Sequence, residues 1–189
     1  MKFGILGAGN VGGALGQRLM ASGHEVRFGV RSPEGREHCV DAAEAVRFGE
    51  IVINALPWRA AEGLLPTLGL DGRVLIDCSN PVGWNNGPQV IARGLETLKG
   101  STGAKVAKAW STFGAEHIHD RGIDVFIAGD DEAKDVLKPL IAEMGQNAVD
   151  CGGVAQAYRL EELAALWIHL ATGGGKGRGW TFKTQDATG

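Results

Sequence analysis

Six residues near the amino terminus have the types and spacing of a phosphate-binding loop. Residues 7–12 read Gly-Ala-Gly-Asn-Val-Gly, which fits the pattern G-x-G-x-x-G, and they lie between a short apolar run and a helix-like segment. In that context Gly7 permits a tight turn, Gly9 lets backbone N–H groups approach a pyrophosphate, and Gly12 allows close packing of helix on strand. The loop predicts a dinucleotide cofactor.

The end of the second expected strand indicates which dinucleotide is bound. Enzymes that use NAD place an acid there, about 20 residues after the loop, to bind the ribose 2′-hydroxyl. Residues 28–33 read Phe-Gly-Val-Arg-Ser-Pro and contain no acid. Arg31 stands where a guanidinium can pair with a 2′-phosphate. Ser32 and Arg36 are further candidates for this phosphate, with a solvated surface position as the alternative. The predicted cofactor is NADP(H).

Three of the five tryptophans directly follow segments expected to be strands or strand-end turns. They are Trp58, Trp84 and Trp110. Core packing is the usual role of a tryptophan. Ligands of open parallel sheets, however, bind outside the carboxyl ends of the strands. Three tryptophans at this edge favour a flat apolar site that holds a second ring beside the nicotinamide.

The same edge lacks the usual sets of acid–base residues. The only tyrosine, Tyr158, is followed four positions later by Glu162 rather than by the lysine of short-chain dehydrogenases. His117 and His119 are acid–base or metal candidates, but we interpret them as solvated or hydrogen-bonded. We therefore assign no catalytic side chain and no metal site. Direct hydride transfer between stacked rings needs only positioning and exclusion of water.

The elements that must position these residues alternate between short apolar runs and helix-like segments. This pattern predicts an α/β protein with a doubly wound, mostly parallel sheet, the Rossmann fold. Strands are expected at 2–6, 25–29, 51–55, 74–78, 104–107 and 125–128. Helices are expected at 11–22, 36–48, 60–68, 88–98 and 130–145.

The chain divides into an NADP-binding domain and two smaller parts. The domain is expected at 1–150, a helix at 151–172 and a glycine-rich tail at 173–189. Apolar residues recur every three or four positions over 154–171, with Glu161 on the opposite, polar side. This amphipathic helix packs either on its own sheet or on the partner in a homodimer. The tail is interpreted as an acceptor lid or as a disordered end.

Composition excludes several classes of partner. The 189 residues carry a formal net charge of −3 without a Lys/Arg run, so neither nucleic acid nor an acidic membrane surface is expected as a partner. No apolar stretch is long enough to span a bilayer. Cys39, Cys78 and Cys151 fit neither a disulfide framework nor a metal motif and predict free thiols in a reducing cytoplasm. The expected partner is a small molecule or a second copy of the chain.

Taken together, the motifs resemble the NADPH-dependent reductases of the deazaflavin coenzyme F-420. The resemblance covers most of the chain, and the matching segments are 7–16, 23–26, 29–31, 56–58, 77–81, 108–112 and 162–170. It implies hydride exchange between C4 of NADPH and C5 of the deazaflavin, with the two rings stacked at the carboxyl edge of the sheet. Three features depart from the family: Val30 replaces a serine, Ser111 replaces an asparagine, and the tail at 173–180 is richer in glycine than expected.

The resemblance also implies which residues bind the cofactor and the acceptor. The pyrophosphate contacts carry over to Ala8, Gly9, Asn10 and Val11, and the 2′-phosphate contact carries over to Arg31. The nicotinamide ribose and pocket would be lined by Leu56, Pro57, Asn80 and Pro81. The acceptor candidates, which combine the tryptophans with the fifth motif, are Trp58, Trp84, Trp110, Ser111 and Thr112.

Other functions stay open at this point. Within enzymes, the substrate that NADPH reduces is alternatively a flavin, a quinone, an imine or a ferric chelate. Pyrroline-carboxylate reductases share the glycine loop but add a large helical domain, and the cytosolic part of six-transmembrane metalloreductases is also similar. Outside enzymes, the chain would be a redox sensor that binds NADPH and catalyses nothing.

Overall fold

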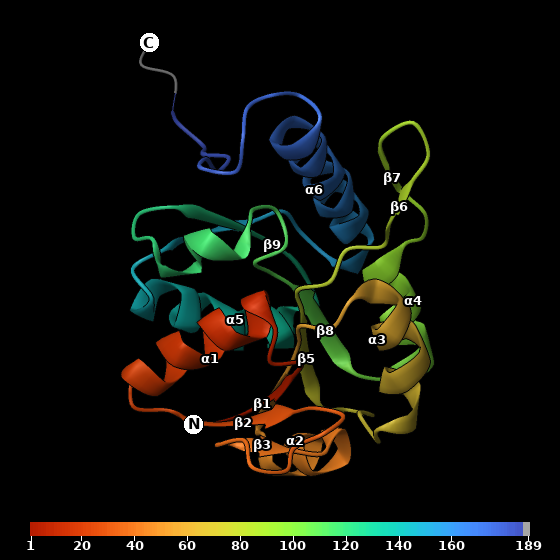
Figure 1. Ribbon diagram of the computed structural model, residues 1–189, viewed down its shortest axis with the longest axis vertical. Helices are drawn as coiled ribbons and strands as arrows, with labels where there is room; N and C mark the ends of the chain where they lie inside the picture. The colour runs from red at the N-terminus through yellow and green to blue at the C-terminus, as the bar shows by residue number, and fades with distance from the viewer. Residues whose placement is uncertain (187–189) are drawn as a thin grey trace.

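The computed structural model describes residues 1–186. Its main sheet has eight strands in the order β10-β9-β8-β5-β4-β1-β2-β3, with helices on both faces (Figure 1). The central parallel strands are β1 (Lys2–Leu6), β2 (Glu25–Gly29), β4 (Ile51–Asn54), β5 (Val74–Asp77) and β8 (Lys105–Lys108). A short strand, β3 (Cys39–Val40), extends one side. The predicted α/β fold with a mostly parallel, doubly wound sheet is confirmed.

Two strands at the other side run in the opposite direction. β9 (Asp124–Gly129) pairs antiparallel with β8, and β10 (Asn147–Asp150) pairs parallel with β9. An antiparallel neighbour needs no crossover helix, so the connection at 109–123 begins and ends at the carboxyl edge of β8. β10 was not expected from the sequence because its residues are mostly polar or exposed.

The core lies in two layers, one on each face of the sheet. α1 (Asn10–Ala21) and α5 (Asp131–Glu143) cover one face, and α2 (Ala42–Phe48), α3 (Trp58–Leu64) and α4 (Gly94–Thr102) cover the other. Successive strand residues point to opposite faces, and both sets are buried, which explains the continuous apolar runs of the central strands. The carboxyl edge of the sheet is left for the site.

The helix expected at 88–98 is wrong in its first half. β6 (Val82–Trp84) and β7 (Pro88–Val90) form an antiparallel hairpin instead, and α4 begins only at Gly94. Asn86 and Gly87 both have positive φ, as a tight hairpin turn requires. The helix expected at 36–48 is also shorter than predicted, because β3 occupies its first half.

The carboxyl-terminal helix packs on its own chain. A 3-10 turn, η3 (Val154–Gln156), precedes α6 (Ala157–Thr172), which contacts β9, α4 and β7 and lies beside the β6–β7 hairpin (Figure 1). Within residues 1–186, no helix combines the length and the apolar character needed to cross a membrane.

Part of the glycine-rich tail folds back on the domain. The Arg178 guanidinium donates to both carboxylate oxygens of Glu116, at 2.7 and 3.0 Å, and this contact lowers the pKa of Glu116. The indole N–H of Trp167 donates to the carbonyl oxygen of Trp180 at 3.0 Å. These contacts hold the tail against α6 and against η2 (Ala115–His119). Residues 187–189 of the expected tail lie outside the described residues.

Candidate functional site

The turn from β1 to α1 leaves backbone donors open at the carboxyl edge of the sheet. Gly7 has a φ of +98°, and its N–H donates to the carbonyl oxygen of Gly29 at 2.9 Å. Gly9 precedes the first residue of α1, no side chain in the described part of the chain caps the helix, and its first turn holds no acid. A Cβ on Gly9 would meet no atom within 4 Å. The helix N-terminus therefore has both the donors and the space that an anion needs.

A cavity of about 570 Å³ extends from this loop along the carboxyl ends of β4 and β5. It brings together seven of the residues predicted from the sequence: Gly9, Asn10, Val11, Leu56, Pro57, Trp58 and Asn80. Its remaining lining residues are Ala55, Arg59, Cys78, Ser79, Val82 and Ile91. The cavity thus joins the phosphate loop to the segments expected beside the nicotinamide.

The candidates for the 2′-phosphate lie apart from this cavity. Arg31 and Ser32 are exposed just beyond the carboxyl end of β2. Arg36 lines a separate cavity of about 310 Å³ together with Ala8. All three side chains are therefore in reach of solvent, and Arg31 is the one that follows the strand end directly.

The acceptor candidates separate into different environments. Trp58 is nearly buried in the wall of the large cavity, and Trp84 is 68% exposed on the β6–β7 hairpin. Ser111 and Thr112 are buried behind the cavity, as is Pro81. The structure does not bring four of these residues to the cavity lining: Trp84, Ser111, Thr112 and Pro81.

Trp110 corrects the expectation of three tryptophans at one open edge. Its side chain is 2% exposed within the core, and its indole N–H donates to Oε1 of Gln146 at 3.0 Å. Its φ of +49° is rare for a bulky residue and turns the chain sharply after β8. Trp110 therefore packs and shapes the turn rather than offering a surface to an acceptor.

The large cavity offers no acid–base pair. None of its lining side chains in the described chain is a carboxylate, an imidazole or a phenol. Burial raises the pKa of the Cys78 thiol far above its usual range, and the neighbouring Asp77 adds to this effect. The thiol therefore stays protonated and is not a nucleophile.

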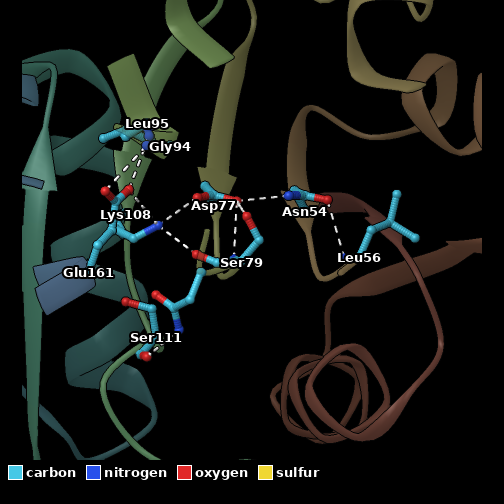
Figure 2. Close-up of polar contacts among 10 residues, drawn as sticks. Asn54, Leu56, Asp77, Ser79, Gly94, Leu95, Lys108, Ser111 and Glu161 are labelled. Carbon is cyan, nitrogen blue, oxygen red and sulfur yellow. Dashed lines mark hydrogen bonds and ion pairs between the residues drawn. The ribbon is translucent and has the colours of Figure 1, made fainter. Parts of the chain in front are cut away.

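Behind the cavity lies a buried polar cluster that the sequence analysis missed (Figure 2). Asp77 Oδ1 accepts hydrogen bonds from Asn54 Nδ2 at 2.7 Å and from the hydroxyl and the N–H of Ser79 at 2.8 and 3.1 Å. Asp77 Oδ2 accepts from Lys108 Nζ at 2.8 Å. Asn54, Asp77 and Lys108 have no exposed surface. The carboxyl ends of β4, β5 and β8 are thus joined by polar bonds.

Glu161 completes this cluster from α6, and its expected place on a polar face is wrong. Its side chain is fully buried, with Oε1 3.5 Å from Lys108 Nζ, and its carboxylate accepts from the N–H groups of Gly94 and Leu95, each at 3.2 Å (Figure 2). Burial raises the pKa of Glu161, and Lys108 opposes that rise. A lysine at the end of a buried strand was the available signal, since such a charge needs a partner.

The fold and the site together define a class: a Rossmann-type protein with a dinucleotide-type glycine loop at the carboxyl edge of its sheet. Comparison with known proteins agrees. The family described as NADP oxidoreductase, coenzyme F420-dependent, matches residues 2–81. The resemblance predicted from the sequence is confirmed over these residues, and the relatives below indicate an NADP-dependent oxidoreductase.

Relatives extend the likeness beyond the matched segment. The F420-dependent NADP reductase of Methanothermobacter marburgensis is 28% identical and covers 90% of this chain and 92% of its own. A solved structure from Arthrobacter sp. FB24, described as a candidate F420-dependent NADP reductase, superposes with a TM-score of 0.86 at 27% identity over 98% of this chain and all of that one. Metalloreductase STEAP3 of Rattus norvegicus is 29% identical over 86% of this chain but only 36% of its own length.

Proposed function

We propose that the protein transfers a hydride directly between NADP(H) and a planar acceptor, and that this acceptor is coenzyme F-420. The observation that carries the proposal is the cavity beside the phosphate loop, whose walls hold no acid–base pair. Such a site suits a reaction in which one ring passes a hydride to another and the proton that completes reduction of the acceptor comes from solvent rather than from a side chain. Two of the named relatives, described as F420-dependent NADP reductases, support this choice of acceptor.

The residues present fit the proposed cofactor. The open N–H groups at the start of α1 suit a pyrophosphate, and Arg31 suits a 2′-phosphate. Asn80 donates through Nδ2 to the carbonyl oxygen of Ser111 at 2.7 Å, whereas its Oδ1 has no partner within residues 1–186. An unpaired buried acceptor favours a ligand that brings a donor, and the nicotinamide carboxamide brings one.

In this assignment the chain binds and orients the reacting rings and excludes water from them. The bound NADPH supplies the hydride. Leu56 and Pro57 would form the wall beside the nicotinamide ribose. Asn80 would bind the carboxamide group of the nicotinamide and so select the face of the ring. Trp58 bounds the acceptor side from within the cavity, and the exposed Trp84 lies on the hairpin whose Val82 also lines it. Apolar side chains around the rings exclude water from the site and keep the two rings in contact.

The acceptor is tested by oxidation of NADPH in the presence of coenzyme F-420, free flavin, a quinone, a cyclic imine and a ferric chelate. We expect F-420 to give the highest kcat/KM. Replacing Trp84 by alanine is expected to raise KM for F-420 several-fold and to leave the Kd for NADPH unchanged. Turnover with another acceptor but not with F-420 would refute the choice of acceptor. NADPH binding without turnover on any of the five would identify a redox sensor.

We also propose that the protein forms a homodimer. Large apolar side chains are exposed on elements that contact each other: Trp84 at 68% and Ile91 at 53% around the hairpin, and Leu166 at 47% on α6. A second copy would remove them from water. Light scattering is expected to give twice the chain mass, and Leu166→Glu is expected to shift the protein toward monomer. A monomeric mass for the unchanged protein at high concentration would contradict the proposal.

A further inference from the structure

The buried cluster behind the cavity places three charged side chains in the interior, where packing alone requires none. Lys108 is fully buried between two carboxylates, Asp77 on β5 and Glu161 on α6. Buried ion clusters are weak contributors to stability, because desolvation of each charge offsets its attraction to the others. Stability alone therefore does not explain the cluster, and its contacts indicate what other role it has.

Two polar bonds of the cluster end on segments that form the cavity wall. Besides binding Asp77, Lys108 Nζ donates to the carbonyl oxygen of Ser79 at 2.6 Å. Asn54 Oδ1 accepts from the N–H of Leu56 at 3.2 Å. Figure 2 shows both branches meeting at Asp77, one toward Leu56 and one toward Ser79. The cluster thus holds the turns that follow β4 and β5, and both turns line the cavity.

Glu161 is the second carboxylate beside Lys108, and its own side chain is closely packed. A Cβ placed on Gly94 would come 2.7 Å from its Oε1 and 3.1 Å from Cγ of Pro81. Only glycine at this position lets the carboxylate reach the first N–H groups of α4 while Pro81 stays in contact. The side chain of Glu161 therefore links α6 to the start of α4 and, through Lys108, to the turn that carries Asn80.

We propose that Lys108 is a positioning residue for the nicotinamide: with Asp77 and Glu161 it fixes the Ser79–Asn80 turn, so that the free Oδ1 of Asn80 meets the carboxamide of the cofactor. The inference rests on the proposed binding of NADP(H) and concerns one end of that molecule only. The adenosine end lies at Arg31, outside the reach of the cluster. A positioning role therefore predicts an effect that depends on whether the ligand carries a nicotinamide.

The test compares two ligands, NADPH and 2′-phosphoadenosine diphosphoribose, which lacks the nicotinamide ring. The variant is Lys108→Met with Glu161→Gln, which keeps the summed charge of the cluster at −1 and leaves Asp77 with its hydrogen bonds from Asn54 and Ser79. We expect the Kd for NADPH to rise about tenfold and that for the ringless ligand to change less than twofold. Thermal unfolding reports whether the variant is folded, and Glu161→Gln alone is the milder variant should the pair fail to fold.

The outcomes separate the inference from the function on which it rests. An equal loss for both ligands would mean that the cluster is merely structural and would overturn the inference. NADPH affinity that stays unchanged in a folded variant would overturn it as well. If the unchanged protein bound neither ligand, the proposed use of NADP(H) itself would fail. Lys108→Arg, which keeps charge and donors, is expected to recover part of the lost NADPH affinity.

Discussion

Gly12→Ala is expected to reduce NADPH affinity on the order of 100-fold and to lower stability by about 1–3 kcal/mol. An added Cβ would overlap the carbonyl oxygen of Gly7 and lie 3.0 Å from its carbonyl carbon and 3.2 Å from Cβ of Ala55. Backbone and a short side chain cannot swing aside, so the turn between β1 and α1 must move. That turn carries the N–H groups proposed to bind the pyrophosphate.

The adjacent Gly13 offers a matched control in the same helix. A Cβ there would lie 3.9 Å from the nearest atom, the carbonyl oxygen of Ala8, which is ordinary contact. Alanine favours a helix over glycine by about 1 kcal/mol, so Gly13→Ala is expected to raise the unfolding temperature and to keep the NADPH Kd within about twofold. Titration calorimetry and thermal unfolding check both variants. Wild-type affinity in Gly12→Ala would show that the loop does not depend on this close approach.

The glycine loop was predictable because its signals are local. Gly7, Gly9 and Gly12 lie within six residues, and the strand before them and the helix after them have clear periodicity. The same holds for the central strands, which are buried on both faces and read as apolar runs. Local patterns of this kind are enough to predict most of the sheet and the floor of the cavity.

The buried cluster was not predictable because its members lie far apart in the chain. Lys108 contacts Glu161 across 53 residues of sequence, and no local pattern around either residue indicates that the two are in contact. The amphipathic pattern placed Glu161 among the exposed charges, since a carboxylate on a helix is usually solvated. Only the packing of α6 across the end of β8 reverses that expectation. For the same reason Trp110, whose partner Gln146 lies 36 residues away, looked like a site residue.

The hairpin at 82–90 shows a different reason for failure. Its strands have three residues each, too few for an alternating pattern to be recognised, and Asn86-Gly87 was the one local signal of a turn. The difference matters for function. The hairpin carries Trp84, which is 68% exposed, beside a cavity that includes Val82 and Ile91.

Arg31→Ala is expected to raise the Kd for NADPH by about 10- to 100-fold and to leave the Kd for NADH within about twofold. The guanidinium follows the end of β2 directly, and no acid stands there to bind a ribose 2′-hydroxyl. Hydrogen bonds to a charged group contribute about 1.5–3 kcal/mol, which sets the size of the effect. NADH has no 2′-phosphate, so the loss of the guanidinium removes nothing from its binding.

Two further arginines make this expectation specific. Arg47→Ala removes an equal charge from the exposed side of α2 and is expected to leave both affinities unchanged, which excludes a general electrostatic effect. Arg36→Ala measures whether the neighbouring cavity shares the phosphate. If Arg31→Ala weakened NADPH and NADH equally, Arg31 would support the loop rather than read the 2′-phosphate, and the preference for NADP(H) would have to come from elsewhere on the β2 edge.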